Sequence, residues 1–128
     1  MEAILEAKRH LDNAKSFLSN NAKKEDGFYR DRKYIKIAGH TAYTGILLAL
    51  DELLKEKKKK TRKSVEWYQK ELSGLDKKIT SDFGAAYQIL HLDMGYDGAN
   101  SSEIAKFGLE KAEKIIGWVE NRLTNHTK

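Results

Sequence analysis

Residues 33–50 read KYIKIAGHTAYTGILLAL, and they give the clearest indication of the fold. Apolar residues recur in it every three or four positions, which is the period of an α-helix. The spacing predicts a long helix over about residues 31–57. Residues 46–50 are apolar on nearly all sides of that helix, so we expect it to be the buried centre of the protein. Small side chains would let a neighbouring helix approach closely; they are Ala38, Ala42, Gly45 and Ala49.

The same period predicts a helix on either side of this centre. An amphipathic helix is expected over about residues 2–20, and the polar residues 20–27 end it and form the first loop. After residue 63, the apolar side chains of Val65, Trp67, Tyr68 and Leu72 predict a short helix that ends near Ser73 and Gly74.

Two further helices follow. Residues 79–90 repeat apolar side chains at helical spacing, and His91 closes this fourth helix. The glycine-containing residues 95–100 predict a turn. Asn100 then fits the N-cap of the last helix, with Glu103 completing a capping box. Five helices with short connections predict an all-α, antiparallel four- to five-helix bundle that forms one domain over residues 1–128.

The charge is concentrated in one segment. The chain has 128 residues with 24 Lys or Arg and 19 Asp or Glu, a net charge of +5. Residues 55–63 hold seven basic groups and one acid, which leaves 17 basic and 18 acidic groups elsewhere. This segment is either a solvated connection or a site that gathers phosphates and so binds nucleic acid. Its candidate phosphate-binding residues are Lys57, Lys58, Lys59, Lys60, Arg62 and Lys63.

Several classes of site are unsupported by the sequence. Cysteine and proline are both absent, so thiolate metal sites and cysteine catalysis are excluded. No HExxH, Glu-x-x-His, phosphate-loop or dinucleotide-binding motif occurs, and we expect neither a metal nor a cofactor. No targeting segment is visible and the longest apolar run is too short to span a bilayer. A cytoplasmic protein without membrane contact is therefore expected.

Two histidines are the candidates for chemistry. His40 lies in the central helix and His91 at the end of the fourth. Histidine is the usual acid–base group of proteins near neutral pH. Each of the two is either a hydrogen-bonded histidine at the edge of the core or a member of a small polar pocket. The candidate pocket consists of His40, Tyr43, Tyr87, His91, Asp93, Tyr96 and Asp97.

Residues 33–50 also resemble the tyrosine- and alanine-rich central helix of HEPN domains (higher eukaryotes and prokaryotes nucleotide-binding). Residues 108–119, GLEKAEKIIGWV, are similar to the closing helix of those domains. Nearly the whole chain looks like a small Bacteroidota family catalogued as a domain of unknown function. That likeness lies in RKSVEWY at 62–68, LHLDMGYDG at 90–98 and IIGWVE at 115–120.

The resemblance implies a HEPN-like bundle that pairs as a homodimer, and it makes RNA cleavage a hypothesis to test. Many HEPN proteins use an Arg and a His with four to six residues between them, and no such spacing occurs here: Arg32 and His40 have seven residues between them, and Arg122 and His126 have three. We therefore predict a non-catalytic module that self-associates or binds a protein partner. The alternative is a HEPN-like nucleotide- or RNA-binding domain.

Overall fold

The computed structural model describes residues 2–57 and 63–125. Five α-helices account for most of this part of the chain, which confirms the all-α helical bundle. In chain order the elements are α1 (Glu2–Ser16), η1 (Phe17–Asn21), β1 (Lys24–Glu25), β2 (Phe28–Tyr29), α2 (Arg32–Leu53), η2 (Lys55–Lys57), α3 (Val65–Ser73), α4 (Lys77–Ala86), η3 (Tyr87–Tyr96) and α5 (Ser102–Asn125).

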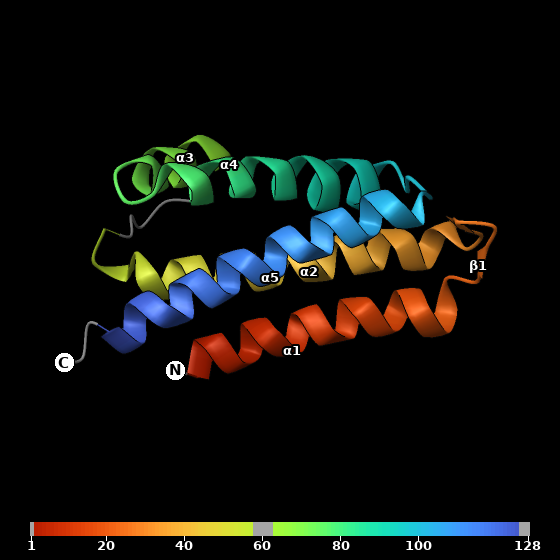
Figure 1. The fold of residues 1–128 in the computed structure, drawn as a ribbon, viewed down its shortest axis with the longest axis horizontal. Helices are drawn as coiled ribbons and strands as arrows, with labels where there is room; N and C mark the ends of the chain where they lie inside the picture. The colour runs from red at the N-terminus through yellow and green to blue at the C-terminus, as the bar shows by residue number, and fades with distance from the viewer. Residues whose placement is uncertain (1, 58–62, 126–128) are drawn as a thin grey trace.

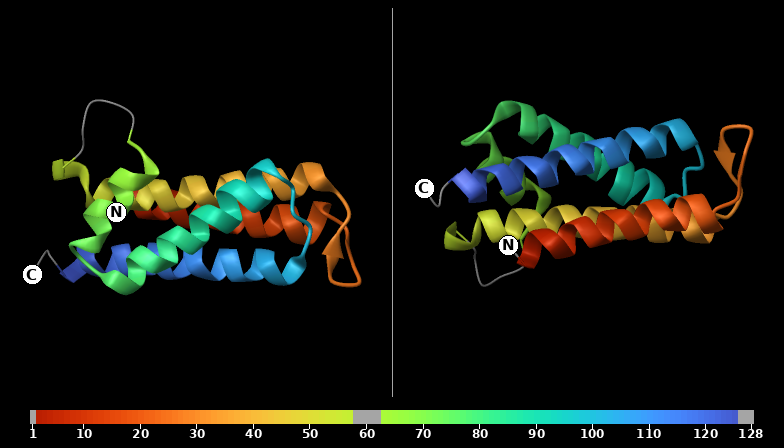
Figure 2. Two further views of the ribbon diagram at one scale, coloured as in Figure 1. Left: turned by 90° about the horizontal axis from the view of Figure 1, so that it is seen from above. Right: turned by 60° about the horizontal axis from the view of Figure 1, so that its bottom comes forward.

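The helices run lengthwise along one elongated bundle. The start of α1 and the end of α5 lie at the same end, and β1 lies at the other (Figure 1). Helix α2 packs against α1, η3 and α5, so it is the centre of the bundle as the sequence predicted. Seen from above, α4 and η3 form one rod that crosses the bundle obliquely (Figure 2). The η3 end of this rod packs against α2, whereas α4 packs mainly against α5 and α3.

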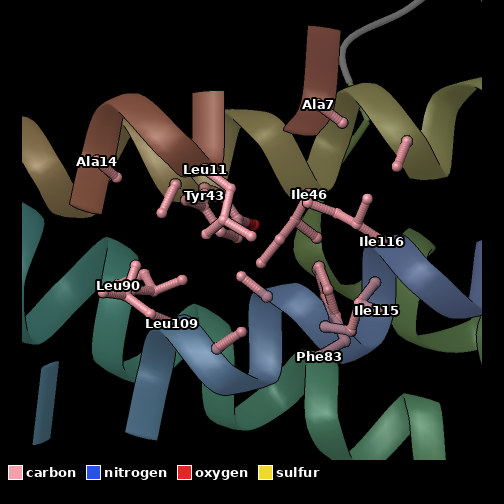
Figure 3. Packing of buried hydrophobic residues seen from close by; sticks show 14 of the residues in the cluster. Ala7, Leu11, Ala14, Tyr43, Ile46, Phe83, Leu90, Leu109, Ile115 and Ile116 are labelled. Carbon is pink, nitrogen blue, oxygen red and sulfur yellow. The ribbon is translucent and has the colours of Figure 1, made fainter. Parts of the chain in front are cut away.

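The core is apolar and draws on four helices. Figure 3 shows Leu11 of α1, Ile46 of α2, Phe83 of α4 and Ile116 of α5 directed into the same interior. All four side chains are buried, and Ile46 and Phe83 have no exposed surface. Truncating a side chain such as Phe83 to alanine costs about 3–5 kcal/mol in a core of this kind.

Polar side chains fix where three of the helices begin. Asp31 accepts a hydrogen bond from the Lys33 amide at the start of α2, over 3.1 Å. Ser64 accepts one from the Trp67 amide at the start of α3, and Asp76 does the same at the start of α4. Each cap satisfies one of the amides that a helix leaves without a partner in its first turn.

Glycine lets α2 approach its neighbours. A Cβ atom on Gly45 would lie 2.9 Å from the Ala7 carbonyl oxygen of α1. One on Gly39 would lie 2.4 Å from the Leu90 carbonyl oxygen of η3. Such distances are too short for any side chain, so both contacts bring helix backbones together and require glycine at these points.

The prediction of a plain loop over residues 20–27 was incomplete. Residues 17–21 continue α1 as a π-helical turn, and β1 then pairs antiparallel with β2. Asp26 and Gly27 form the two-residue turn between the strands, and both have positive φ angles, of 52° and 85°. Asp-Gly is the sequence that such a hairpin turn prefers, because both central residues must adopt the left-handed conformation.

The end of the fourth helix and the start of the fifth were placed wrongly. The rod does not close at His91 but continues to Tyr96, so Gly95 and Tyr96 are helical and the turn begins later. Ser101, not Asn100, caps α5: its hydroxyl accepts a hydrogen bond from the Ile104 amide over 3.3 Å. The Asn100 carbonyl instead accepts one from the Tyr29 amide, because residues 100–102 pair with β2.

Within residues 2–57 and 63–125, no helix combines the length and the hydrophobicity that are needed to cross a bilayer.

Candidate functional site

The site is built on η3, a run of ten residues in π-helical conformation. A π-helix closes its hydrogen bonds from residue i to i+5, so it has more residues per turn than an α-helix. Residues four and five apart therefore come onto one face, and this places Tyr87, His91 and Tyr96 side by side. In an α-helix, Tyr96 would point well away from His91. π-Helical segments are rare and are frequently found at functional sites.

The crossing of α2 and η3 brings the second histidine to this face. Gly39 lies against the Leu90 carbonyl, so its neighbour His40 faces η3 beside His91. Gly95 makes room for the imidazole, because a Cβ atom at this position would lie 2.7–3.0 Å from three ring atoms of His40. Tyr43 follows one turn after His40 on α2 and faces the same way.

Five rings thus form the His–Tyr cluster, which consists of His40, Tyr43, Tyr87, His91 and Tyr96. His91 is at its centre: its ring centroid lies 4.7 Å from that of Tyr43, 5.1 Å from Tyr96, 5.3 Å from Tyr87 and 5.5 Å from His40. His40 also contacts Tyr96 edge-on at 5.4 Å. These separations are typical of favourable aromatic pairs.

The cluster extends from the core to the surface. The Tyr43 ring is buried, His40, Tyr87 and His91 are half-buried, and Tyr96 is 61% exposed. Burial raises the pKa of the Tyr43 hydroxyl, and the neighbouring Tyr87 raises it further. Because Tyr96 is the most exposed of the five rings, a ligand arriving from solvent would meet it first.

The surroundings of His91 favour the uncharged form of its imidazole. Burial lowers the pKa of its imidazole below the usual 6.5, and the nearby His40 lowers it further. Its Nδ1 atom is buried and has no hydrogen-bond partner among the described residues. An unsatisfied buried polar atom costs free energy, and such atoms in a native protein call for an explanation such as an unseen ligand.

Two cations border the cluster. Arg32, Lys36 and His40 follow one another at intervals of four on α2, so they share one face of that helix. The Arg32 Nε and Lys36 Cε atoms lie 3.4 and 3.3 Å from the position of a Cβ atom on Gly98. Arg32 also donates a hydrogen bond to the Asp97 carbonyl oxygen over 3.2 Å. Neither cation makes an ion pair with another residue that the structure describes.

The two acids expected in the pocket have other partners. The Asp93 carboxylate accepts a hydrogen bond of 2.9 Å from Gln88 of the same helix. Asp97 takes part through its backbone carbonyl rather than through its carboxylate. The structure thus gathers the five rings of the expected pocket, while their role as a site stays a prediction.

The candidate phosphate-binding segment is only partly described. Lys58, Lys59, Lys60 and Arg62 lie outside the described residues. The Lys57 Nζ atom lies 3.5 Å from a Glu71 carboxylate oxygen.

Lys63 is largely buried and ion-paired. Its side chain is 12% exposed, and its Nζ atom lies 2.6 Å from Asp51 of α2. The same Asp51 oxygen accepts a hydrogen bond from the Tyr68 hydroxyl over 2.6 Å. Lys63 therefore ties the start of α3 to α2, a role that its place in a basic run did not reveal.

Arg32 and Lys36 do not stand out in the sequence, because the basic residues are denser at 55–63. Their spacing from His40 was visible, but the partner surface was not. That surface depends on Gly98, whose φ angle of +66° turns the chain back over the first turns of α2.

The hydrogen bonding of the two histidines bears on acid–base catalysis. A catalytic histidine is usually held by a carboxylate or carbonyl that fixes its tautomer. Among the described residues, neither His40 nor His91 makes such a hydrogen bond. No three His, Asp or Glu side chains gather into a metal-binding group in that part of the chain.

A groove of about 1230 Å³ lies elsewhere, between the end of α1, the hairpin and the first half of α5. Lys15, Lys24 and Lys106 line it together with Asp26, Glu103, Glu110 and Glu113. Its charges are mixed, and Lys15 pairs with Glu113 across it at 3.5 Å. Because it contains no histidine and its charges nearly balance, we regard the His–Tyr cluster as the stronger candidate.

Comparison with known proteins identifies the family. Residues 2–121 match the model of a family described as a domain of unknown function (DUF5618). The chain belongs to this family. A solved structure of a protein of unknown function from Dyadobacter fermentans is 51% identical, with a TM-score of 0.88, and the match covers 95% of this chain and 96% of that one. No curated protein matches. The resemblance to the small family is thus confirmed, while the HEPN likeness stays a prediction.

Proposed function

We propose that this DUF5618 protein is a non-catalytic binding module whose ligand site is the His–Tyr cluster. The ligand is a nucleotide or a single-stranded RNA. A base stacks on the exposed ring of Tyr96 beside His40, and a phosphate is held by Arg32 and Lys36. The observation that carries the proposal is that five aromatic rings meet beside Arg32 and Lys36, which pair with no acid in the part of the chain that the structure describes.

The chemistry of the surroundings supports this class of ligand. Stacking of a base on an aromatic side chain contributes about 1–3 kcal/mol and tolerates any base. Arginine and lysine bind phosphate oxygens through charge-assisted hydrogen bonds. The Nδ1 atom of His91 offers a further polar contact to a ligand that reaches the centre of the cluster.

Calorimetric titration with adenosine monophosphate and with a short single-stranded RNA at low salt tests the proposal. Tyr96→Ala should weaken binding about 5- to 150-fold, as expected from the loss of one stacked base. Arg32→Ala and Lys36→Ala should weaken it and reduce its salt dependence. Phe28→Ala is the matched control, because Phe28 is 53% exposed on the hairpin, away from the cluster. Absence of binding, or an equal loss in the control, would refute the proposal.

The non-catalytic part is tested separately. RNA incubated with the protein should stay intact, because neither imidazole is held by an acid. Cleavage that disappears in both the His40→Ala and the His91→Ala variants would show that the protein is an enzyme.

The basic segment is a further proposed phosphate contact. Neutralising Lys58, Lys59 and Lys60 by glutamine should weaken RNA binding by lowering the number of neutralised phosphates. If RNA binding is unchanged, the segment only provides solubility.

The module is also proposed to self-associate or to bind a protein. Support comes from large apolar side chains of the helices and their connections that stay exposed, at 40–66%: Leu5, Leu75, Ile104 and Phe107. Sedimentation that finds only monomer up to millimolar concentration would remove self-association from the proposal.

A further inference from the structure

The outward surface of α5 carries an ordered row of residues. Positions 103, 107, 110, 114, 117 and 121 follow at intervals of four and three, so they lie in one line along the helix. This line faces away from the buried side chains of α5, which include Ala105, Ala112, Ile116 and Val119. We call it the α5 row; its members are Glu103, Phe107, Glu110, Lys114, Gly117 and Asn121.

Gly117 is the first unusual member. It lies inside a helix of 24 residues, where glycine is less favourable than alanine because it loses more backbone freedom. A Cβ atom on Gly117 would meet nothing within 4 Å. On the same helix, by contrast, Gly108 is required by packing, since its Cβ would lie 2.6 Å from Ile89. Packing among the described residues therefore does not explain a glycine at position 117, whereas contact with a partner outside the chain would explain it.

Phe107 is the second unusual member. Its side chain is 48% exposed on the middle of a regular helix, and Ile104 beside it is 44% exposed. Glu110 and Lys114 lie between Phe107 and Gly117 and are also exposed. Neither makes an ion pair with another described residue. An apolar ring, an open glycine and two unpaired charges thus share one helix surface.

The side chains of the α5 row are complementary to those of a second α5 row that runs in the opposite direction. If a second copy of α5 lies antiparallel, with the twofold axis between residues 110 and 114, Glu110 meets Lys114 of the other copy. The same alignment places Phe107 over Gly117 and Glu103 beside Asn121. Because the interface is twofold, each of these contacts occurs twice. A parallel alignment would instead oppose each charge to its like.

We infer that α5 pairs antiparallel with α5 of a second copy of this chain, with the Phe107 ring seated on Gly117 of the other copy and the Glu110–Lys114 pairs on either side of the axis. This inference rests on the proposed self-association and gives it a surface. A helix pair with an aromatic ring over glycine allows close approach of the two backbones. The charges then fix the antiparallel direction.

Charge exchange tests the direction of pairing. Glu110→Lys and Lys114→Glu should each weaken the dimer at least about tenfold in sedimentation equilibrium, since each variant sets like charges against one another twice. An equimolar mixture of the two variants should recover dimer, because both pairs then have opposite signs. The double variant Glu110→Lys with Lys114→Glu should also dimerise. Loss of dimer in the mixture would overturn the inferred alignment.

Substitutions of Phe107 and Gly117 test the proposed contact between the ring of one copy and the glycine of the other. Gly117→Leu should abolish the dimer, while the monomer stays folded because the position is open. Phe107→Ser should weaken the dimer at least about tenfold, and Phe28→Ser on the hairpin should leave it unchanged. A wild-type monomer at all concentrations would refute both self-association and this surface. A wild-type dimer that tolerates Gly117→Leu and Phe107→Ser would refute this surface alone.

Discussion

Gly39→Ala tests the helix crossing on which the site depends. The new methyl group would lie 2.4 Å from the Leu90 carbonyl oxygen, 2.8 Å from Met94 Cβ and 2.9 Å from the Gly95 amide nitrogen. Two of these atoms are backbone, so they cannot rotate away, and α2 and η3 must separate.

The expected change in the free energy of unfolding is the sum of two opposing effects. Overpacking of this kind costs about 1–3 kcal/mol, and replacing a helical glycine by alanine returns up to about 1 kcal/mol. We expect a net loss of about 1–2 kcal/mol. With a urea m-value of about 2 kcal/mol per molar, the unfolding midpoint should fall by about 0.5–1 M.

Urea unfolding followed by far-ultraviolet circular dichroism measures this change. Gly117→Ala is the matched control at low protein concentration, because nothing lies within 4 Å of its new methyl group. It should raise the stability by about 0.5–1 kcal/mol. If Gly39→Ala stabilises the protein as Gly117→Ala does, with unchanged m-value, the close contact of α2 and η3 is refuted.

Two predictions concern ionisable side chains that are buried or half-buried. The lowered pKa of His91 means that the unfolded chain binds the proton more readily, so stability should be complete above pH 6.5 and fall as the pH drops below it. Urea midpoints between pH 7.5 and 5 should show this slope, His91→Gln should flatten it, and an unchanged slope in that variant would contradict the assignment. Asp82→Asn should cost about 3 kcal/mol, because it leaves Lys111, 15% exposed and 2.9 Å away, without its partner. Lys78 also pairs with Asp82, but its side chain is 67% exposed, so Lys78→Ala should cost less than about 1 kcal/mol. Equal losses of stability in the Asp82→Asn and Lys78→Ala variants would contradict this expectation.

Much of the fold could be predicted because helical periodicity is a local signal. The apolar stretch around Ile46 is buried as expected, and α3 covers residues 65–73 with its end at Gly74. The hairpin was missed although its turn, Asp26-Gly27, is a recognisable signal. Two-residue strands leave no alternating pattern from which they could be detected.

All five rings of the cluster belong to the pocket expected from the sequence, but their geometry could be predicted only in part. His40, Tyr43, Tyr87 and His91 follow from helical spacing on two packed helices. Tyr96 depends on the π-helical turn, which changes the period at a place where the sequence shows only glycine-rich turn residues. The turn at Gly98 has a local signal, but its packing against Arg32 and Lys36 is a long-range contact that the sequence does not show.

The proposed ligand site can be tested most directly by nuclear magnetic resonance of the ring protons during titration with adenosine monophosphate. We expect saturable shifts of the Tyr96, His40 and His91 rings, and no shift of Phe28 on the hairpin. In the Tyr96→Ala variant, the shifts of the His40 and His91 rings should also vanish. Rings of the His–Tyr cluster that stay unshifted at millimolar ligand, or a shift as large at Phe28, would contradict the claim that this cluster is the binding site.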